Sequence, residues 1–246
     1  MNQGKKIDIE NISFFRENLE EALDFYANIE STFTPMSPAR KVVYDNIQEA
    51  FRGVTCKGEK AVLVGCAAKD DYLTEAEIES LSIPEERDCW QNISPQWLYA
   101  CCESLCYAGP EAFRFLIPVY MCASLQYNAR DGRMFEVHIG VAKSKTERIL
   151  GYSREQMILL DERQKNAISM YLRQMWCEDH EVDFESGDSL PSFEYDERND
   201  SIGITPWELD DYSAVQRDMS YREYVSTLIA DYIRWMHEKI GQLSPS

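Results

Sequence analysis

The stretch that decides the fold spans residues 110–128 and reads PEAFRFLIPVYMCASLQYN. Apolar side chains follow one another there with no polar face, which is typical of a helix that is buried on all sides. The stretch contains Arg114 and Pro118 and is too short to cross a membrane. It therefore predicts the central helix of a mainly α-helical protein, and we expect residues 1–246 to form a single compact domain.

Helix-start chemistry recurs along the rest of the chain. Ser or Thr is followed three residues later by Glu at Thr74 and at Ser220, so that the hydroxyl and the carboxylate each satisfy a backbone N–H at the helix start. Serine precedes proline at Ser37 and Ser94, and Asp161 stands three residues before a glutamine. Together with the apolar periodicity, these patterns predict helices at 14–30, 38–52, 61–70, 74–82, 95–107, 110–128, 161–177 and 220–240.

One segment alternates in the manner of a strand. Apolar residues occupy every second position from Phe135 to Val141, after the turn-forming pair Asp131-Gly132. This pattern predicts a small β-hairpin beside the helices.

The segment 181–218 differs sharply in composition from the rest. It holds twelve Asp and Glu and two Arg, a net charge of -10 out of -18 for the whole chain, and it has no helical periodicity. We therefore expect a long acidic loop or insertion. Aromatic residues are interleaved with the charge and are costly to leave in water, so this segment is expected to cover a surface.

The charge of -18 narrows the possible partners. Such a surface repels nucleic-acid phosphates and anionic lipid and attracts basic molecules, so we expect a basic protein partner, no direct nucleic-acid binding and no membrane. The first ten residues are polar, and the eight cysteines include no CxxC pair. Both features favour a cytoplasmic protein with reduced thiols.

Motifs that carry chemistry are scarce. The sequence has no GxGxxG, GxxxxGK[ST], GxSxG or HExxH pattern. Cys177 and His180 share a helix face, yet no second pair of ligands accompanies them, and structural zinc requires four. We expect no catalytic residue, no metal and no cofactor, and an enzyme is disfavoured.

Arg114 is the charged residue of the central stretch that calls for an explanation. A guanidinium on a buried helix must be paired, because burying it alone costs several kcal/mol. We expect either a buried ion pair, with Asp88 as the candidate partner, or an anion-binding pocket around Arg114.

The blocks DCWQNISP (88–95) and FRFLIPVYM (113–121) resemble an uncharacterised bacterial family with D-x-W and F-R-F-x-x-P-x-Y-M motifs, a domain of unknown function. Ala50-Phe51, Asp70-Asp71 and the helix expected from Asp161 fit the same order. The resemblance covers about residues 38–175. It implies a compact helical fold and brings no activity or catalytic residues.

These observations favour an interaction protein, such as a bacterial immunity or antitoxin-like inhibitor of a basic toxin. The alternative is a small-ligand-binding protein or enzyme with a pocket around Arg114. A DNA mimic ranks third, because its carboxylates would be spread along an extended face. The residues expected to bind the partner are Glu185, Asp188, Glu194, Asp196, Glu197, Asp200, Trp207, Asp210 and Asp211.

Overall fold

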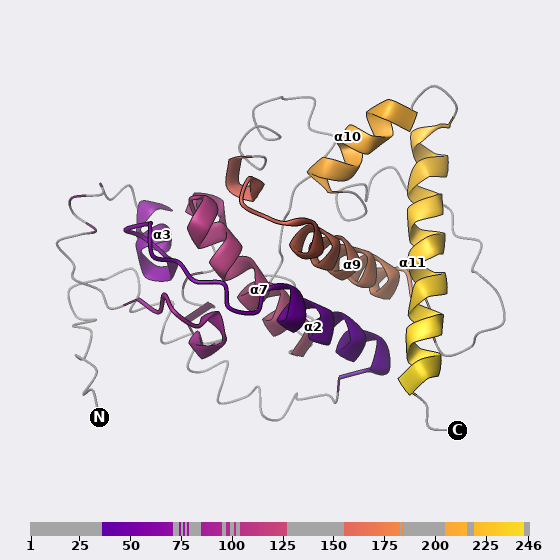
Figure 1. Cartoon of the computed structure of the whole chain (residues 1–246), viewed down its shortest axis with the longest axis horizontal. Helices are drawn as coiled ribbons and strands as arrows, with labels where there is room; N and C mark the ends of the chain where they lie inside the picture. Colours follow the sequence, from indigo (N-terminus) through magenta and orange to yellow (C-terminus); the bar gives the residue numbers. More distant parts are fainter. Residues whose placement is uncertain are drawn as a thin grey trace. The chain divides into compact units, whose positions relative to one another are not determined.

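Every regular element of the described chain is a helix (Figure 1). The computed structural model describes residues 36–70, 74, 76, 78, 85–94, 97–98, 101, 104–126, 155–182, 184, 205–215 and 219–243. The mainly α-helical fold predicted from the sequence is therefore confirmed for this part of the chain.

The described residues fall into two compact units. The first draws on residues 51–126 and 156–159, and the second on residues 36–50 and 160–243. The expectation of a single domain over residues 1–246 stays a prediction.

The first unit is built around α7 (Pro110–Gln126), the helix expected to be central. Twelve of its seventeen residues are buried, so the reading of this stretch as a helix without a polar face is confirmed. The short helix α6 (Ser104–Tyr107) and the 3-10 turn η2 (Trp90–Asn92) pack against α7, while α3 (Leu63–Asp70) packs against α6.

Aromatic residues of both family-like motifs lie in the core of this unit. Trp90 is 2% exposed, and its indole Nε1 donates a hydrogen bond of 3.0 Å to the carbonyl oxygen of Phe51, which is fully buried. On α7, the Tyr120 hydroxyl donates to the carbonyl oxygen of Cys101 at 2.6 Å. These aromatic residues fill the core and also satisfy buried backbone carbonyls.

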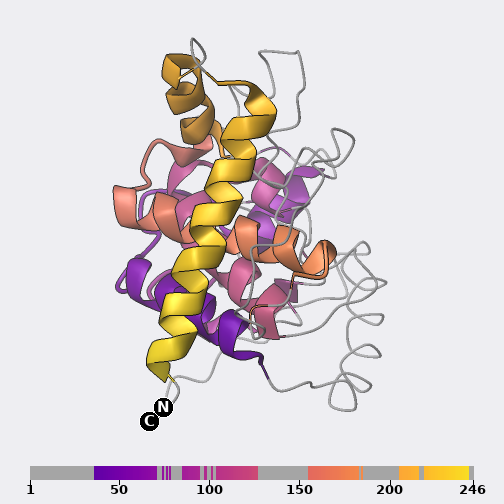
Figure 2. The same ribbon diagram turned by 90° about the vertical axis from the view of Figure 1, so that its right-hand side faces the viewer.

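The second unit contains α2 (Pro38–Ala50), α9 (Glu162–Asp179), α10 (Pro206–Val215) and α11 (Tyr221–Leu243). α2 and α9 pack together, and α11 crosses both of them (Figure 2). The sequence predicts an apolar stripe on α11 that includes Val225, Tyr232 and Met236, and these three are buried, together with Ile229. Helices from early and late parts of the chain therefore share one core.

The helix starts follow the predicted capping chemistry. Asp161 Oδ1 accepts from Gln164 N at 2.9 Å, and Asp161 N donates to Gln164 Oε1 at 3.2 Å, which is a complete capping box at α9. Ser220 N donates to Glu223 Oε2 at 2.8 Å, and Glu223 N donates back to Ser220 Oγ at 3.3 Å, at the start of α11. These two predicted starts are confirmed.

One prediction about the acidic segment is wrong. Residues 206–215 form a helix, α10, where the sequence analysis expected a loop without helical periodicity. The predicted helix 14–30 and the predicted hairpin near residues 131–141 lie outside the described residues, as does most of 181–204. Helices 74–82 and 95–107 are described only in part.

No helix in the described ranges combines the length and the apolar character that crossing a membrane requires.

Candidate functional site

The acidic segment supplies the candidate site, and its described part is mostly α10. Of the residues expected to bind a partner, Trp207 and Asp211 lie on this helix with described side chains, half-buried and exposed respectively. Asp210 lies between them on the backbone of α10. The remaining six, Glu185, Asp188, Glu194, Asp196, Glu197 and Asp200, lie outside the described residues.

The start of α10 is capped by Glu208, three residues after Thr205. Thr205 precedes Pro206, and the Glu208 carboxylate accepts hydrogen bonds from Thr205 N at 2.8 Å and from Thr205 Oγ1 at 2.7 Å. The Glu208 carboxylate thus satisfies the backbone N–H of Thr205, and proline stands where its missing donor has no cost. This Thr-Pro-x-Glu pattern is present in the sequence and could have predicted the start of α10. The acidic composition of the surrounding segment favoured a loop instead.

A buried ion pair holds α10 against α9. Nη2 of Arg173 donates to Oε1 of Glu208, and the two side chains are only 9% and 11% exposed. Beside them, Trp207 Nε1 donates to Ser169 Oγ at 3.2 Å, and Ser169 lies 3.4 Å from the hydroxyl of buried Thr205. The start of α10 is thus fixed by charge, hydroxyl and indole contacts together.

The ion pair of Arg173 with Glu208 engages only part of the Arg173 guanidinium. Among the described residues, the buried Nε of Arg173 has no hydrogen-bond partner, and the second oxygen of Glu208 is engaged by Thr205. Elsewhere in the unit, Arg40 makes the fuller contact: its Nε and Nη2 donate to the two oxygens of Glu178 at 2.7 and 2.5 Å. The Arg173 pair is therefore a structural anchor with one donor left over.

A second polar chain ties the core helices together. Tyr232 on α11 donates through its hydroxyl to Gln174 Oε1 at 2.8 Å, and Gln174 Nε2 donates to Glu178 Oε1 at 2.9 Å. Glu178 in turn receives Arg40 from α2. Burial raises the pKa of Tyr232, so its hydroxyl stays protonated and remains a donor. This chain orients α2, α9 and α11.

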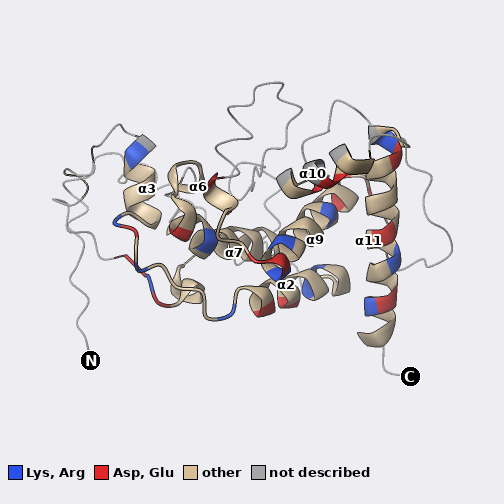
Figure 3. Cartoon of the chain, turned by 45° about the horizontal axis from the view of Figure 1, so that its top comes forward, with Lys and Arg blue, Asp and Glu red and all other residues tan. Residues whose placement is uncertain are grey.

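Asp211 behaves differently from Glu208. Its side chain is exposed, and within the described residues it takes part in no ion pair. The acidic helix therefore anchors itself by one carboxylate and displays another to solvent. In Figure 3 the ribbon of α10 is red at described acidic positions, and the helix has no Lys or Arg in its sequence.

The prediction that Arg114 and Asp88 form a buried ion pair is wrong for Asp88. Asp88 is exposed and lies 3.3 Å from the ammonium of Lys57, itself an exposed side chain. Arg114 is half-buried on α7. Arg173 forms a buried ion pair with Glu208 of α10. α10 was not predicted from the sequence, so this pair could not be predicted either.

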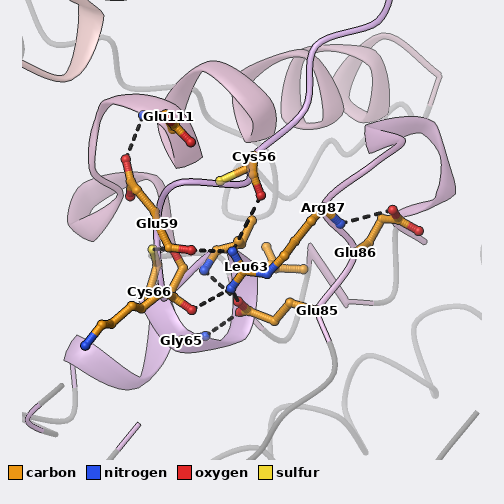
Figure 4. Close-up of polar contacts among 12 residues, drawn as sticks. Cys56, Glu59, Leu63, Gly65, Cys66, Glu85, Glu86, Arg87 and Glu111 are labelled. Carbon is orange, nitrogen blue, oxygen red and sulfur yellow. Dashed lines mark hydrogen bonds and ion pairs between the residues drawn. The ribbon is translucent and has the colours of Figure 1, made fainter. Parts of the chain in front are cut away.

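Another charged cluster lies in the first unit (Figure 4). The Glu85 carboxylate accepts hydrogen bonds from the backbone N–H groups of Val62 and Gly65, both at 2.7 Å, and so caps the start of α3. Its side chain is 5% exposed. Burial raises the pKa of Glu85, while the two N–H groups and Arg87, 3.3 Å away, partly oppose that rise.

Arg87 belongs to the same cluster and binds the backbone of the loop before α3. Its guanidinium donates to the carbonyl oxygens of Cys56 at 3.5 Å, of Lys60 at 2.5 Å and of Glu59. These are backbone acceptors in the loop before α3. The Glu85–Arg87 pair therefore holds a loop and a helix start, which is a structural role.

Two glutamates lock the start of α7 in a reciprocal way. Glu59 Oε1 accepts from Glu111 N at 2.7 Å, and the Glu111 carboxylate accepts from Gly58 N at 2.7 Å. A Cβ atom on Gly58 or on Gly109 would lie within 2.6 Å of one of these carboxylates. Glycine at both positions lets the carboxylates approach the backbone.

The cysteines of the described chain are buried thiols for the most part. Burial raises the pKa of Cys56 to about 11 and that of Cys66 to about 12, and burial likewise raises the pKa of Cys177 to about 12. Thiols with such pKa values are protonated at neutral pH and are poor nucleophiles. His180 stacks on Trp176 at 3.8 Å, and its Nδ1 lies 2.8 Å from the carbonyl oxygen of Trp176. Among the described residues, no three Cys, His, Asp or Glu side chains are grouped to hold a metal.

The fold and the candidate site define a mainly helical protein whose buried charges fix helices, with an acidic helix anchored on a helical body. The chain belongs to a family of unknown function, DUF6714, whose model matches residues 39–190. The expected resemblance to an uncharacterised family is confirmed. No curated protein and no solved structure matches the chain. α10 and α11 lie beyond the residues that the family model matches.

Proposed function

We propose that the chain is a protein-interaction protein that binds a basic partner through the acidic segment 181–218. The observation that carries the proposal is the contrast on α10 between Glu208, which is buried against Arg173, and Asp211, which is exposed and has no ion pair in the described chain. A helix that is anchored by one carboxylate presents the other in a fixed position, which lowers the entropic cost of binding.

Composition supports the same function. The segment 181–218 carries a net charge of -10 and interleaves that charge with aromatic residues. Acidic surfaces accelerate encounter with basic proteins, and aromatic anchors within a charged rim are common binding hot spots. The specific form we propose is a cytoplasmic inhibitor of a basic toxin, in the manner of an immunity protein or an antitoxin. The pocket around Arg114 and the DNA mimic stay predictions that no described contact favours.

The test is capture of a partner by the full chain and by a charge-reversed variant. The variant carries Glu194→Lys, Asp196→Lys, Glu197→Lys and Asp200→Lys. We expect the wild type to capture a basic protein at low salt and to lose it as salt rises, because screening shortens the reach of the charges. The variant should capture none and should keep its melting temperature within a few degrees.

A matched control distinguishes the effect of the charge in segment 181–218 from the effect of the net charge of the chain. Glu155, Glu162, Asp231 and Glu238 are exposed and lie outside the segment, so their replacement by lysine changes the net charge by the same amount. The proposal requires that this control still binds the basic protein. Equal capture by the wild type and the segment variant would contradict it.

A further inference from the structure

Two tyrosine rings meet where α10 ends and α11 begins. The ring centroids of Tyr212 and Tyr224 lie 5.4 Å apart with an interplanar angle of 42°. Both side chains are half-buried, so part of each ring faces solvent. Aromatic faces carry a negative potential that attracts cations, and rings fixed by mutual packing offer that potential at little entropic cost.

Two carboxylates of α10 act electrostatically on the Tyr224 ring of this pair. Asp211 precedes Tyr212 in the chain and is exposed. The pKa of Tyr224 is raised by partial burial first and then by the charges of Glu208 and Asp211, with Arg173 opposing. Arg173 is paired with Glu208, whereas Asp211 takes part in no ion pair among the described residues.

The end of α10 adds a third contribution of the same sign. The last turn of α10 contains no basic residue, so the partial negative charge of its final carbonyl groups is not compensated from within the helix. Asp211 lies close to that end, and its negative charge adds to the partial negative charge of the carbonyl groups, which destabilises an isolated helix. A cation supplied from outside would relieve both effects.

We propose that this corner of Asp211, Tyr212 and Tyr224 binds the guanidinium group of an arginine side chain on the partner. The inference rests on the proposed function and names the chemical group that the acidic surface binds. A guanidinium suits the corner better than an ammonium does, because its plane stacks on aromatic rings while its N–H groups donate to a carboxylate.

Arg222 is the charged group on α11 that opposes such binding. It is exposed in the first turn of α11 and forms no ion pair with Asp211. Its positive charge reduces the attraction for an incoming cation. Glu223, next to it, is engaged by Ser220 at the helix start. Removal of the Arg222 charge should therefore strengthen binding.

The probe is an acetylated hexaarginine amide, with a hexalysine of the same form, titrated calorimetrically into the full chain at low salt. We expect Asp211→Asn to weaken hexaarginine binding about fivefold. Tyr224→Leu should weaken it about threefold, and Tyr224→Phe, which keeps the ring, should leave it unchanged. Arg222→Gln should tighten it about twofold.

Asp231→Asn is the charge-matched control. Asp231 is exposed on α11 and pairs with Arg234 at 2.9 Å, so its loss changes the net charge as Asp211→Asn does. Equal effects of the two substitutions would overturn the inference, as would hexalysine binding as tightly as hexaarginine. Melting curves confirm that each variant is folded.

The two proposals fail in different ways. If the full chain captures a basic partner but the corner variants bind it unchanged, the guanidinium site is wrong and the proposed function stands. If no variant, control or wild type binds any basic protein, the proposed function is wrong.

Discussion

At the scale of single residues, Glu208 and Asp231 make a direct comparison. Glu208 is 11% exposed in its pair with Arg173, whereas the Asp231 side chain is 60% exposed in its pair with Arg234. We expect Glu208→Gln to lower the free energy of unfolding by about 3 kcal/mol, because it leaves a buried guanidinium uncompensated and weakens the cap of α10. Urea denaturation followed by circular dichroism measures the loss.

The exposed pair supplies the control. Asp231→Asn should change the free energy of unfolding by less than about 0.5 kcal/mol, because solvent screens surface pairs. Equal losses in the two variants would show that the Arg173–Glu208 pair is not buried in solution.

Glu85 gives a prediction about pH. Its pKa is raised in the folded protein, first by burial, so the native state binds this proton more tightly than the unfolded state does. By linkage, its contribution to stability falls as pH rises from about 4.5 through the raised pKa and is constant above it. The stability of the wild type relative to Glu85→Gln should therefore fall across that window, measured by urea unfolding at several pH values. A constant difference would contradict the prediction.

Side-chain roles were predictable where the partner is close in sequence. Asp161 with Gln164 and Ser220 with Glu223 cap their helices as expected, because a cap depends on only four residues. Arg114 was expected to form a buried ion pair with Asp88, but Asp88 is exposed, and Arg173 forms a buried ion pair with Glu208. Its burial depends on Thr205 and Glu208, more than thirty residues further along the chain, and sequence spacing does not reveal such contacts.

At the scale of helices, the start of α7 yields a prediction about glycine. A Cβ on Gly109 would lie 2.5 Å from a Glu59 oxygen, and that carboxylate is bonded to the N–H groups of Glu111 and Ala112. We expect Gly109→Ala to cost about 1 kcal/mol, because Glu59 must move and the helix loses its cap. Thermal unfolding monitored at 222 nm measures the change.

Gly241 is the matched control for this substitution. It lies near the end of α11 with nothing within 4 Å of a Cβ. Gly241→Ala should raise stability by a few tenths of a kcal/mol through helix propensity. If Gly109→Ala is also neutral or stabilising, the Glu59 cap does not hold α7.

Helices with apolar faces were more predictable than α10. Residues 110–126 are buried almost all round, and α11 buries a stripe at three- and four-residue spacing, so both are visible in the sequence. α10 is short and its apolar residues do not recur on one face, and Arg173 and Ser169 on α9 bind its side chains Glu208 and Trp207. Its tertiary contacts decide its structure, and a pattern of hydrophobicity cannot report them.

At the scale of the whole molecule, the net charge of -18 predicts a response to salt. Like charges repel one another in the folded state, and about 0.3 M salt screens that repulsion beyond roughly 6 Å. We expect the melting temperature to rise by several degrees between about 0.02 and 0.3 M sodium chloride. Replacing Glu194, Asp196, Glu197 and Asp200 by their amides should reduce the rise, and an unchanged rise would show that the segment contributes little to the repulsion.

The ion pair of Arg40 with Glu178 joins residues that lie 138 positions apart. On the ribosome, the helix that carries Arg40 emerges long before α9 and α11, the two described helices that pack against it, are made. Synthesis of the second unit therefore includes an interval in which the apolar face of α2 has been made but α9 and α11 have not. We expect chaperones to bind nascent chains that are halted between α2 and α9. This binding should be lost once α11 is complete.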